Sequence, residues 1–318
     1  MVFRDGESAV DVREIVTGQL PGYRIDSVAL LGEGQDNLAY TVNGELIVRF
    51  AKEPDPESRA ARVIGESGLL AAVADILPLP VPEPCFSVPE QGCLAYFALP
   101  GRPLIDLPPA RRSAAHTRPI AAVLGKFLAA LHGAPVDRVV ALVDADDQPN
   151  RLWLDEAGQT YDTLAGEVPP AHRPAVEAFL GAEPPGDSYD PVFSHNDLGI
   201  EHVLVDSVSG TVTGVIDWSD AAIVDPAYDF GLLYRDLGPA ALDTALDHYR
   251  TVPDAQAIRT RAAFYARCSV LEDMAYGLEH GLEKYLDKSL AALTWLYPSP
   301  ADPSRPSGKA GARRPWAP

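Results

Sequence analysis

Two aspartates, Asp197 and Asp217, lie in segments whose residue types could carry out chemistry on a phosphate group. Asp197 belongs to the run HNDL at 195–198, and His202 follows it by five residues. Asp217 follows an apolar pair in the run VIDW at 215–218. Phosphoryl transfer needs one group that orients the acceptor hydroxyl and accepts its proton, and another that holds a metal ion on the phosphates. These two segments predict such a centre.

The segment between the two aspartates predicts a β-hairpin that would bring them together. Residues 202–206 alternate between apolar and polar types, 207–210 form a turn cluster, and 211–216 are rich in β-branched residues. In protein kinases the motif H-R-D-L-x-x-x-N has the same spacing, and its Asn helps to hold Mg²⁺. We therefore expect Asp197 to take the hydroxyl proton and Asp217 to bind Mg²⁺. We expect the second metal ligand at His202. Since imidazole is a poor ligand for Mg²⁺, the alternatives are that His202 acts through a water molecule or only shapes the site.

A longer pattern across residues 195–230 resembles the antibiotic phosphotransferases of the aminoglycoside and macrolide type. The family pattern is H-[GN]-D-L-x-x-x-[NH]-x-L, then G-x-I-D-[WF], then D-P-x-x-D-[FL]. The matching residues are His195, Asp197, Leu198, His202, Leu204, Gly214, Ile216, Asp217, Trp218, Asp225, Pro226, Asp229 and Phe230. A His at position 202 is expected of the macrolide and 2''-aminoglycoside branches. Asp225 and Asp229 are interpreted as structural, with Asp225 capping a helix that Pro226 opens.

The resemblance implies an α+β, protein-kinase-like fold of two lobes. Residues 1–100 would form an N-terminal nucleotide-binding lobe with a small antiparallel sheet, and a hinge is expected near 96–101. Residues 102–300 would form a larger, mostly helical lobe for catalysis and substrate binding. The Pro/Gly/Ala/Arg-rich tail, 301–318, is predicted to be disordered.

Three residues of the first lobe are candidates for binding phosphate, and a fourth would support one of them. Gly32 and Gly34 lie in a turn where backbone N–H groups could approach phosphate oxygens, although an ordinary hairpin turn also fits. Two strands, 38–42 and 45–50, flank Asn43-Gly44 and predict a hairpin with a two-residue type I′ loop. Arg49 on that hairpin takes the place of the lysine that kinases use, and Glu66 on the following helix would brace it. The alternatives are a surface arginine on an edge strand and a solvent-facing glutamate.

The predicted hinge is the place where backbone groups of Tyr96 and Ala98 would meet a purine. Backbone recognition leaves the choice between ATP and GTP open. In the second lobe, helices are predicted over 120–131, 162–179, 237–252 and 258–295, and no chemistry is assigned to 134–190. His132 is expected to satisfy carbonyl groups at the end of the first helix.

Glu272 and Asp273 are candidates for contacting the acceptor. In the aminoglycoside kinases, acidic groups of this lobe meet substrate ammonium groups. The alternative is a solvated helix face whose carboxylates pair with residues such as Lys288.

The overall charge also bears on the partner. With 26 basic and 45 acidic residues the chain carries a net charge of −19, which argues against nucleic acid. A cationic small molecule fits this field, and so does a purely solubilising role. Three cysteines, Cys85, Cys93 and Cys268, lack metal-type spacing. Without a signal-type segment or a run of eighteen apolar residues, the expectation is a cytoplasmic protein that does not enter membranes.

The sequence thus predicts an enzyme that transfers the γ-phosphate of ATP or GTP, with Mg²⁺, to a hydroxyl of an aminoglycoside-type antibiotic and so confers resistance. Three alternatives stay open. They are a kinase of a macrolide or nucleoside antibiotic, a kinase of a small metabolite such as choline or homoserine, and a nucleotide-binding pseudokinase.

Overall fold

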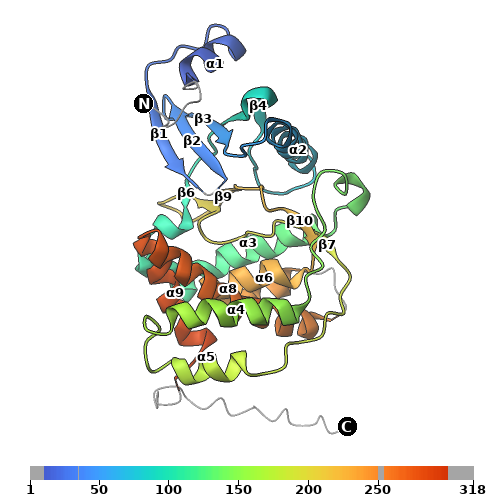
Figure 1. Ribbon diagram of the computed structural model, residues 1–318, viewed down its shortest axis with the longest axis vertical. Helices are drawn as coiled ribbons and strands as arrows, with labels where there is room; N and C mark the ends of the chain where they lie inside the picture. The colour runs from blue at the N-terminus through green and yellow to red at the C-terminus, as the bar shows by residue number, and fades with distance from the viewer. Residues whose placement is uncertain (1–10, 35, 250–253, 300–318) are drawn as a thin grey trace, which may run out of the picture.

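The computed structural model describes residues 11–34, 36–249 and 254–299, arranged as a small sheet-containing lobe above a larger helical lobe (Figure 1). The α+β, two-lobed prediction is confirmed. The predicted tail at 301–318 lies outside the described residues, and the boundaries 1–100 and 102–300 remain our proposal for the two lobes. None of the helices in the described ranges has both the length and the apolar character that a bilayer span requires.

The N-terminal lobe is built on one antiparallel sheet with strand order β1-β2-β3-β5-β4. Its strands are β1 (Val28–Glu33), β2 (Asn37–Val42), β3 (Leu46–Ala51), β4 (Pro84–Val88) and β5 (Cys93–Phe97). Two helices, α1 (Val12–Gln19) and α2 (Pro56–Ala74), accompany the sheet (Figure 1). Val16 of α1 packs with Val42, Leu46 and Val48 in a small hydrophobic core that is separate from the main core of the protein. This core holds α1 against the sheet that carries β3.

The β2–β3 hairpin is confirmed, with one difference at its turn. Asn43 and Gly44 both have positive φ, 55° and 74°, and the Glu45 N–H donates to the Val42 carbonyl at 3.1 Å. The ladder nevertheless pairs Val42 with Leu46, so the loop has three residues where two were predicted. β3 lies between β2 and β5, which makes it an interior strand. Arg49 is buried there, and the alternative of a surface arginine on an edge strand is wrong.

The C-terminal lobe packs its helices around α8, which contacts α4, α6 and α9. The helices are α3 (Ala114–His132), α4 (Asn150–Leu164), α5 (Arg173–Leu180), α6 (Ala227–Leu237), α7 (Pro239–His248), α8 (Ala255–Glu279) and α9 (Glu283–Leu296).

Two predicted helices of this lobe were wrong in extent. The helix predicted over 162–179 is two helices, because Pro169 and Pro170 fall between α4 and α5 and supply no N–H donors. The helix predicted over 258–295 is also two, α8 and α9, and Gly281 between them has a φ of 64°. In both cases the helical spacing of apolar residues continues in the sequence across a point where the helix ends.

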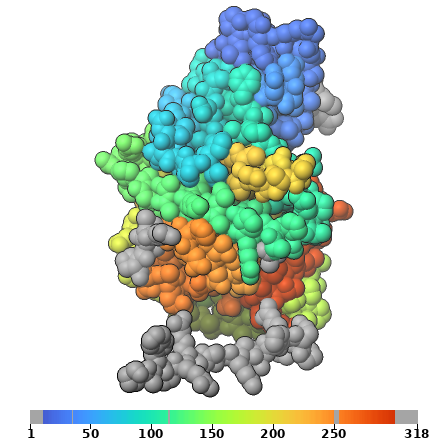
Figure 2. Space-filling model, turned by 180° about the vertical axis from the view of Figure 1, so that it is seen from behind, coloured from blue at the N-terminus to red at the C-terminus, as the bar shows by residue number. Residues whose placement is uncertain are grey.

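Short strands hold the segments that were predicted to be catalytic. They are β6 (Arg102–Pro103), β7 (Val192–Ser194), β8 (Val203–Val205), β9 (Val212–Val215) and β10 (Ala222–Val224). The predicted hairpin is β8–β9, so Asp197 lies before it and Asp217 directly after it. The Val215 N–H donates to the Pro80 carbonyl at 3.0 Å, and the hairpin, yellow in Figures 1 and 2, lies where the two lobes meet.

Candidate active site

An open cleft of 710 Å³ lies between the sheet of the first lobe and the helices of the second. Most of the predicted site residues line it: Gly32, Gly34, Arg49, Tyr96, Asp197, His202, Asp217, Glu272 and Asp273. Two do not. Glu66 lies behind Arg49, and Ala98 is exposed outside the cleft lining.

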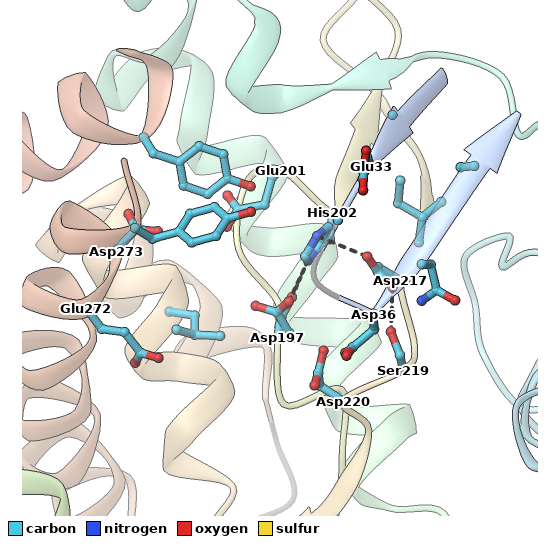
Figure 3. Close-up of a pocket in the computed structure, with 18 of the residues that line it drawn as sticks. Glu33, Asp36, Asp197, Glu201, His202, Asp217, Ser219, Asp220, Glu272 and Asp273 are labelled. Atoms are coloured by element: carbon cyan, nitrogen blue, oxygen red, sulfur yellow. Dashed lines mark hydrogen bonds and ion pairs between the residues drawn. The ribbon is translucent and has the colours of Figure 1, made fainter. Parts of the chain in front are cut away.

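His202 lies between the two aspartates (Figure 3). Its Nδ1 is 3.2 Å from Asp197 Oδ2, and its Nε2 is 3.6 Å from Asp217 Oδ2. Nδ1 also contacts the Asp197 backbone carbonyl at 2.8 Å, and a carbonyl only accepts, so Nδ1 carries a hydrogen. The hairpin therefore brings Asp197 and Asp217 to the same imidazole, that of His202. Twenty residues of sequence separate them.

The surroundings move the pKa values of the two aspartates in opposite directions. Burial raises the pKa of Asp197, although 37% of its side chain is accessible. His202 acts to lower this pKa, and Glu201 and Asp220 raise it further. Burial also acts to raise the pKa of Asp217, but Arg49 and His202 outweigh it and hold this pKa below its usual range. Asp217 thus keeps its charge more readily than an ordinary aspartate, and Asp197 takes up a proton more readily.

His202 responds to both aspartates. Burial acts to lower its pKa, but the carboxylates of Asp197, Glu201 and Asp217 outweigh burial and raise it. The raised pKa favours an imidazolium at this position, which would reduce the repulsion between the two aspartates.

Both catalytic segments contain a residue in the left-handed backbone region. Asn196 has a φ of 63° and Asp217 a φ of 64°, values that non-glycine residues adopt at a cost of roughly 1–3 kcal/mol. The carboxylate of Asp229 accepts from the His195 N–H at 3.2 Å and from the Asn196 N–H at 2.9 Å. Asp229 therefore fixes the loop that presents Asp197, which gives its predicted structural role a definite form.

Asp229 is itself held by a residue whose role was mispredicted. His132 was expected to satisfy carbonyl groups at the end of α3. Its Nε2 instead lies 3.0 Å from Asp229 Oδ2, and its Nδ1 lies 2.9 Å from the Tyr249 hydroxyl. The buried imidazole thus connects α3 to the catalytic loop through a carboxylate.

His195 ties the two catalytic segments to each other. Its Nε2 lies 3.1 Å from the Ile216 carbonyl, so Nδ1 is free to accept from the Asp197 N–H at 3.3 Å. Burial lowers the pKa of His195 to about 4, which keeps the ring neutral and this arrangement intact at physiological pH.

Arg49 reaches from the sheet toward the metal-binding candidate. Its Nη1 is 2.6 Å from Glu66 Oε1, and its Nη2 is 3.5 Å from Asp217 Oδ1. Glu66 is only 10% exposed at its side chain, so the solvent-facing alternative is wrong. The planar fork lets one side chain contact a carboxylate from each lobe, which a lysine could not do with the same geometry.

The backbone contacts predicted for a nucleotide are partly occupied within the protein. The Gly34 N–H donates to the Asn37 carbonyl at 2.9 Å, and the Ala98 N–H donates to the Glu45 carbonyl at 2.7 Å. The roles assigned to Gly32, Gly34, Tyr96 and Ala98 stay predictions. For Gly34 and Ala98, the amide hydrogens are already engaged.

Behind the catalytic loop is a buried group of charges that the sequence did not reveal. It comprises three carboxylates and two cations: Glu201, Asp236, Asp273, Arg235 and Lys288. Lys288 Nζ lies 2.8 Å from Glu201 Oε2 and 3.2 Å from Asp273 Oδ2. Asp236 accepts from the Ile200 N–H at 3.0 Å, so this buried network holds the catalytic loop from behind.

Adjacent residues on α8 divide between the network and the cleft. Asp273 is buried, pairs with Lys288 and accepts from Ser289 Oγ at 2.9 Å. Glu272 is exposed, and no ion pair reaches it from residues 11–34, 36–249 or 254–299. The alternative pairing of these carboxylates with Lys288 is observed for Asp273, but this pair is buried and does not lie on a solvated face.

Comparison with known proteins identifies the family. The chain matches the Phosphotransferase enzyme family over residues 27–265. It belongs to this family. The matched span contains Arg49, Glu66 and both catalytic segments, and it ends before Glu272, Asp273 and Lys288.

Individual members of the phosphotransferase family show the same likeness. The chain is 28% identical over 244 residues to a viomycin phosphotransferase of Streptomyces vinaceus, covering 74% of this chain and 82% of that protein. Among solved structures, the GDP and kanamycin complex of APH(2")-IIia superposes with a TM-score of 0.66 at 23% identity, covering 88% of this chain and 96% of the other. A macrolide 2'-phosphotransferase of Brachybacterium faecium gives 0.60 at 25% identity, with 88% and 96% covered.

Proposed function

We propose that this phosphotransferase moves the γ-phosphoryl group of ATP or GTP to a hydroxyl of an aminoglycoside-type antibiotic and so confers resistance. The observation that carries the proposal is the convergence of Asp197 and Asp217 on His202, with their pKa values displaced in opposite directions. A solved relative binds GDP and kanamycin, and its fold matches this one along most of both chains.

The carboxylates divide the work. Asp197 orients the acceptor hydroxyl and accepts its proton as the new P–O bond forms, because a loose transition state needs positioning more than a strong base. Arg49, braced by Glu66, neutralises charge on the nucleotide phosphates. His202 hydrogen-bonds the Asp197 backbone and so keeps Asp197 in register with the phosphate.

The residues at Asp217 fit a magnesium ion that arrives with the nucleotide. No group of three or more His, Cys, Asp or Glu side chains within the described part of the chain could hold a metal by itself. Mg²⁺ in nucleotide sites takes one or two carboxylates and completes its shell with phosphate oxygens and water. Asp217 supplies such a carboxylate, and the ion would neutralise charge on the β- and γ-phosphates. His202 would lose its proton beside this ion, since the two positive charges repel.

An acceptor with amino groups is supported by Glu272. Among the neighbouring carboxylates, Glu201 and Asp273 are neutralised internally, and Glu272 is accessible in the cleft. The net charge of −19 attracts cations in general. A second candidate acceptor is viomycin, favoured by the 28% identity to a viomycin phosphotransferase.

The test is nucleotide turnover by the purified chain with ATP and with GTP. The acceptor panel contains kanamycin, gentamicin, viomycin, a macrolide, a nucleoside antibiotic, choline and homoserine. We expect turnover that depends on an aminoglycoside, with the phosphorylated product detected by mass spectrometry. Turnover only with viomycin would assign the second candidate, and turnover only with choline or homoserine would make the chain a metabolite kinase. Nucleotide binding without turnover for any acceptor would contradict the proposal and favour a pseudokinase.

A further inference from the structure

Two hydroxyl groups in the wall of the active-site cleft are not engaged by the protein itself. They belong to Tyr228 of α6 and Ser269 of α8, and both residues line the cleft that contains Asp197. The two residues are only 9% and 3% exposed. Buried polar side chains nearly always have a hydrogen-bond partner, so two without one in the same wall indicate a ligand.

The packing of α6 on α8 brings the two residues into the same part of the wall. The Tyr228 ring centroid lies 5.3 Å from that of Tyr265, which precedes Ser269 by one helical turn on α8. One turn beyond Ser269, Asp273 Oδ1 lies 3.9 Å from Nη1 of Arg235, a residue of α6 that also lines the cleft. Ser269 is therefore placed between these two contacts of α8 with α6.

The ring of Tyr228 is fixed, but its hydroxyl is not. Its centroid lies 5.2 Å from that of Trp153 as well as 5.3 Å from that of Tyr265. The Tyr265 hydroxyl donates to Asp225 Oδ2 at 3.2 Å. The Tyr228 hydroxyl forms no hydrogen bond with any residue that the structure describes. Two adjacent tyrosines therefore differ in whether the protein uses their hydroxyl groups.

Ser269 also differs from other hydroxyl residues in helices. Such side chains often donate to the carbonyl one turn earlier, as Thr260 of α8 does to the Gln256 carbonyl at 3.0 Å. The Oγ of Ser269 is shielded from water and has no partner in residues 11–34, 36–249 and 254–299. Leaving it unpaired is costly. A change of rotamer about Cα–Cβ is enough to turn this hydroxyl toward a ligand in the cleft.

The chemistry of the two hydroxyls selects the kind of ligand group. Burial raises the pKa of Tyr228 well above its ordinary value, and Glu272 and Asp197 raise it further against the effect of Arg235. The phenol therefore stays protonated, and both O–H groups need a partner with a lone pair. An ammonium group has none. An anion would be repelled by Asp197 and Glu272, so a neutral oxygen fits best.

We propose that Tyr228 and Ser269 determine specificity by donating hydrogen bonds to uncharged hydroxyl, ether or carbonyl oxygens of the acceptor. The inference rests on the proposed function, because it requires the acceptor's reacting hydroxyl to lie at Asp197. It concerns a neutral part of the acceptor, which the carboxylate of Glu272 does not recognise. An acceptor without these oxygens would leave two buried hydroxyls unpaired, and the enzyme would discriminate against it.

The first test compares the two adjacent tyrosines. Tyr228→Phe removes the unpaired hydroxyl and keeps the ring, and Tyr265→Phe is the matched control. Titration calorimetry on the full chain, with GDP and with ADP, measures the Kd of kanamycin and of viomycin. For the antibiotic that binds wild type, we expect Tyr228→Phe to raise the Kd roughly three- to tenfold without lowering the melting temperature. Tyr265→Phe should lower the melting temperature and change the Kd less than about twofold, because its hydroxyl bonds to Asp225.

The second test compares two buried serines. Ser269→Ala removes a hydroxyl without a partner, so it should raise the same Kd roughly three- to tenfold and leave the melting temperature unchanged or higher. Ser289 of α9 is the matched control, since it is 1% exposed and donates to Asp273 Oδ2 at 2.9 Å. Ser289→Ala should lower the melting temperature and change the Kd less than about twofold. Nucleotide affinity should not change in Tyr228→Phe or Ser269→Ala.

The third test asks whether the partner is oxygen or nitrogen. Monodeamino analogues of the bound antibiotic each lack one amino group. Removing an amino group should weaken binding to Tyr228→Phe and to Ser269→Ala by the same factor as binding to wild type, because independent contacts are additive. If the effect of one amino group disappeared in either variant, that nitrogen would be the partner and the inference would be overturned.

The outcomes separate this inference from the proposed function. Weaker antibiotic binding by both Tyr228→Phe and Ser269→Ala, without any phosphate transfer by wild type, would refute the function and leave the role of the two hydroxyls standing. Phosphate transfer by wild type, with a Kd that is unchanged in either variant, would keep the function and overturn the inference. The inference also fails if neither antibiotic binds the wild-type chain.

Discussion

The carboxylates in front of the catalytic loop and those behind it differ in what compensates their charge. In front, Asp197 and Asp217 are 37% and 38% exposed at their side chains and share one imidazole, and Asp217 also contacts Arg49. Behind, Glu201, Asp236 and Asp273 are nearly inaccessible and contact Arg235 and Lys288. The front pair thus has carboxylate oxygens accessible to a ligand such as a hydroxyl or a metal ion. The carboxylate oxygens of the rear group are instead engaged by buried cations and, at Asp236, by a backbone N–H.

The contrast is sharpest at Glu272 and Asp273, which are neighbours on α8. Both line the cleft (Figure 3), but only Asp273 is paired with a buried cation, Lys288. Carboxylates that are close in sequence can therefore serve different ends, and burial with an internal cation separates them. An acidic cluster in a kinase-like lobe is informative about substrate binding only after the internally neutralised members have been removed from it.

The largest effect should come from the front group. Asp197→Asn keeps the shape of the side chain and removes its ability to accept a proton, so kcat should fall by roughly 10²–10⁴-fold. Nucleotide affinity should stay within about twofold of wild type, because the role proposed for Asp197 is toward the acceptor hydroxyl and not the nucleotide. Steady-state kinetics and calorimetric nucleotide titration measure the two quantities. A variant that transfers phosphate at nearly the wild-type rate would show that Asp197 is not the proton acceptor.

A stability loss should come next, from the rear group. Lys288→Met leaves Glu201 and Asp273 buried with one cation fewer, and breaking a buried ion pair costs about 3–5 kcal/mol. The matched control is Lys284→Met, one helical turn earlier on α9. Lys284 is 65% exposed and pairs with Asp106, so its loss should cost no more than about 1 kcal/mol. Urea unfolding measures the free energy of unfolding of both variants. Equal losses would show that the buried ion pairs of Lys288 stabilise the fold no more than the exposed pair of Lys284.

The pH dependence of kcat/KM connects the two groups. Asp197 must be ionised to accept a proton, and its pKa is raised, so activity should fall as the pH drops through a value above the usual range for aspartate. Glu201 contributes to this rise. Removing Lys288 leaves Glu201 less compensated, so the acidic limb of Lys288→Met should move to higher pH. Lys284→Met should leave the limb in place. An unmoved limb in both variants would mean that the rear group acts on structure alone.

The smallest effects should distinguish the two α8 neighbours. Glu272→Gln should raise the acceptor KM several-fold and change the free energy of unfolding by less than about 0.5 kcal/mol, as for most surface substitutions. Asp273→Asn should do the reverse, with a stability loss of about 1–3 kcal/mol from disrupted buried hydrogen bonds. Kinetics with varied acceptor and thermal melts of both proteins test this. If both variants raised the KM equally, the division of α8 into a cleft side and a network side would be incorrect.

Much of the catalytic geometry could be predicted because it depends on local patterns. The Asn43-Gly44 turn and the β8–β9 ribbon follow from residue types within about fifteen positions, and the ribbon is enough to bring Asp197 and Asp217 together. Helix boundaries were less accurate. Apolar periodicity continues across Pro169-Pro170 and across Gly281, so the pattern alone joined helices that the backbone separates.

The sequence by itself determined which carboxylates flank the hairpin, which strand carries Arg49, and the family to which the pattern belongs. Only the tertiary structure decided which of the remaining charged residues face a ligand. Lys288 of α9 reaches Asp273 of α8 because these two helices pack together, and Trp153 of α4 meets Tyr228 of α6 because both of their helices pack on α8. Such pairings are set by packing between distant segments, and no spacing within either segment encodes the identity of its partner.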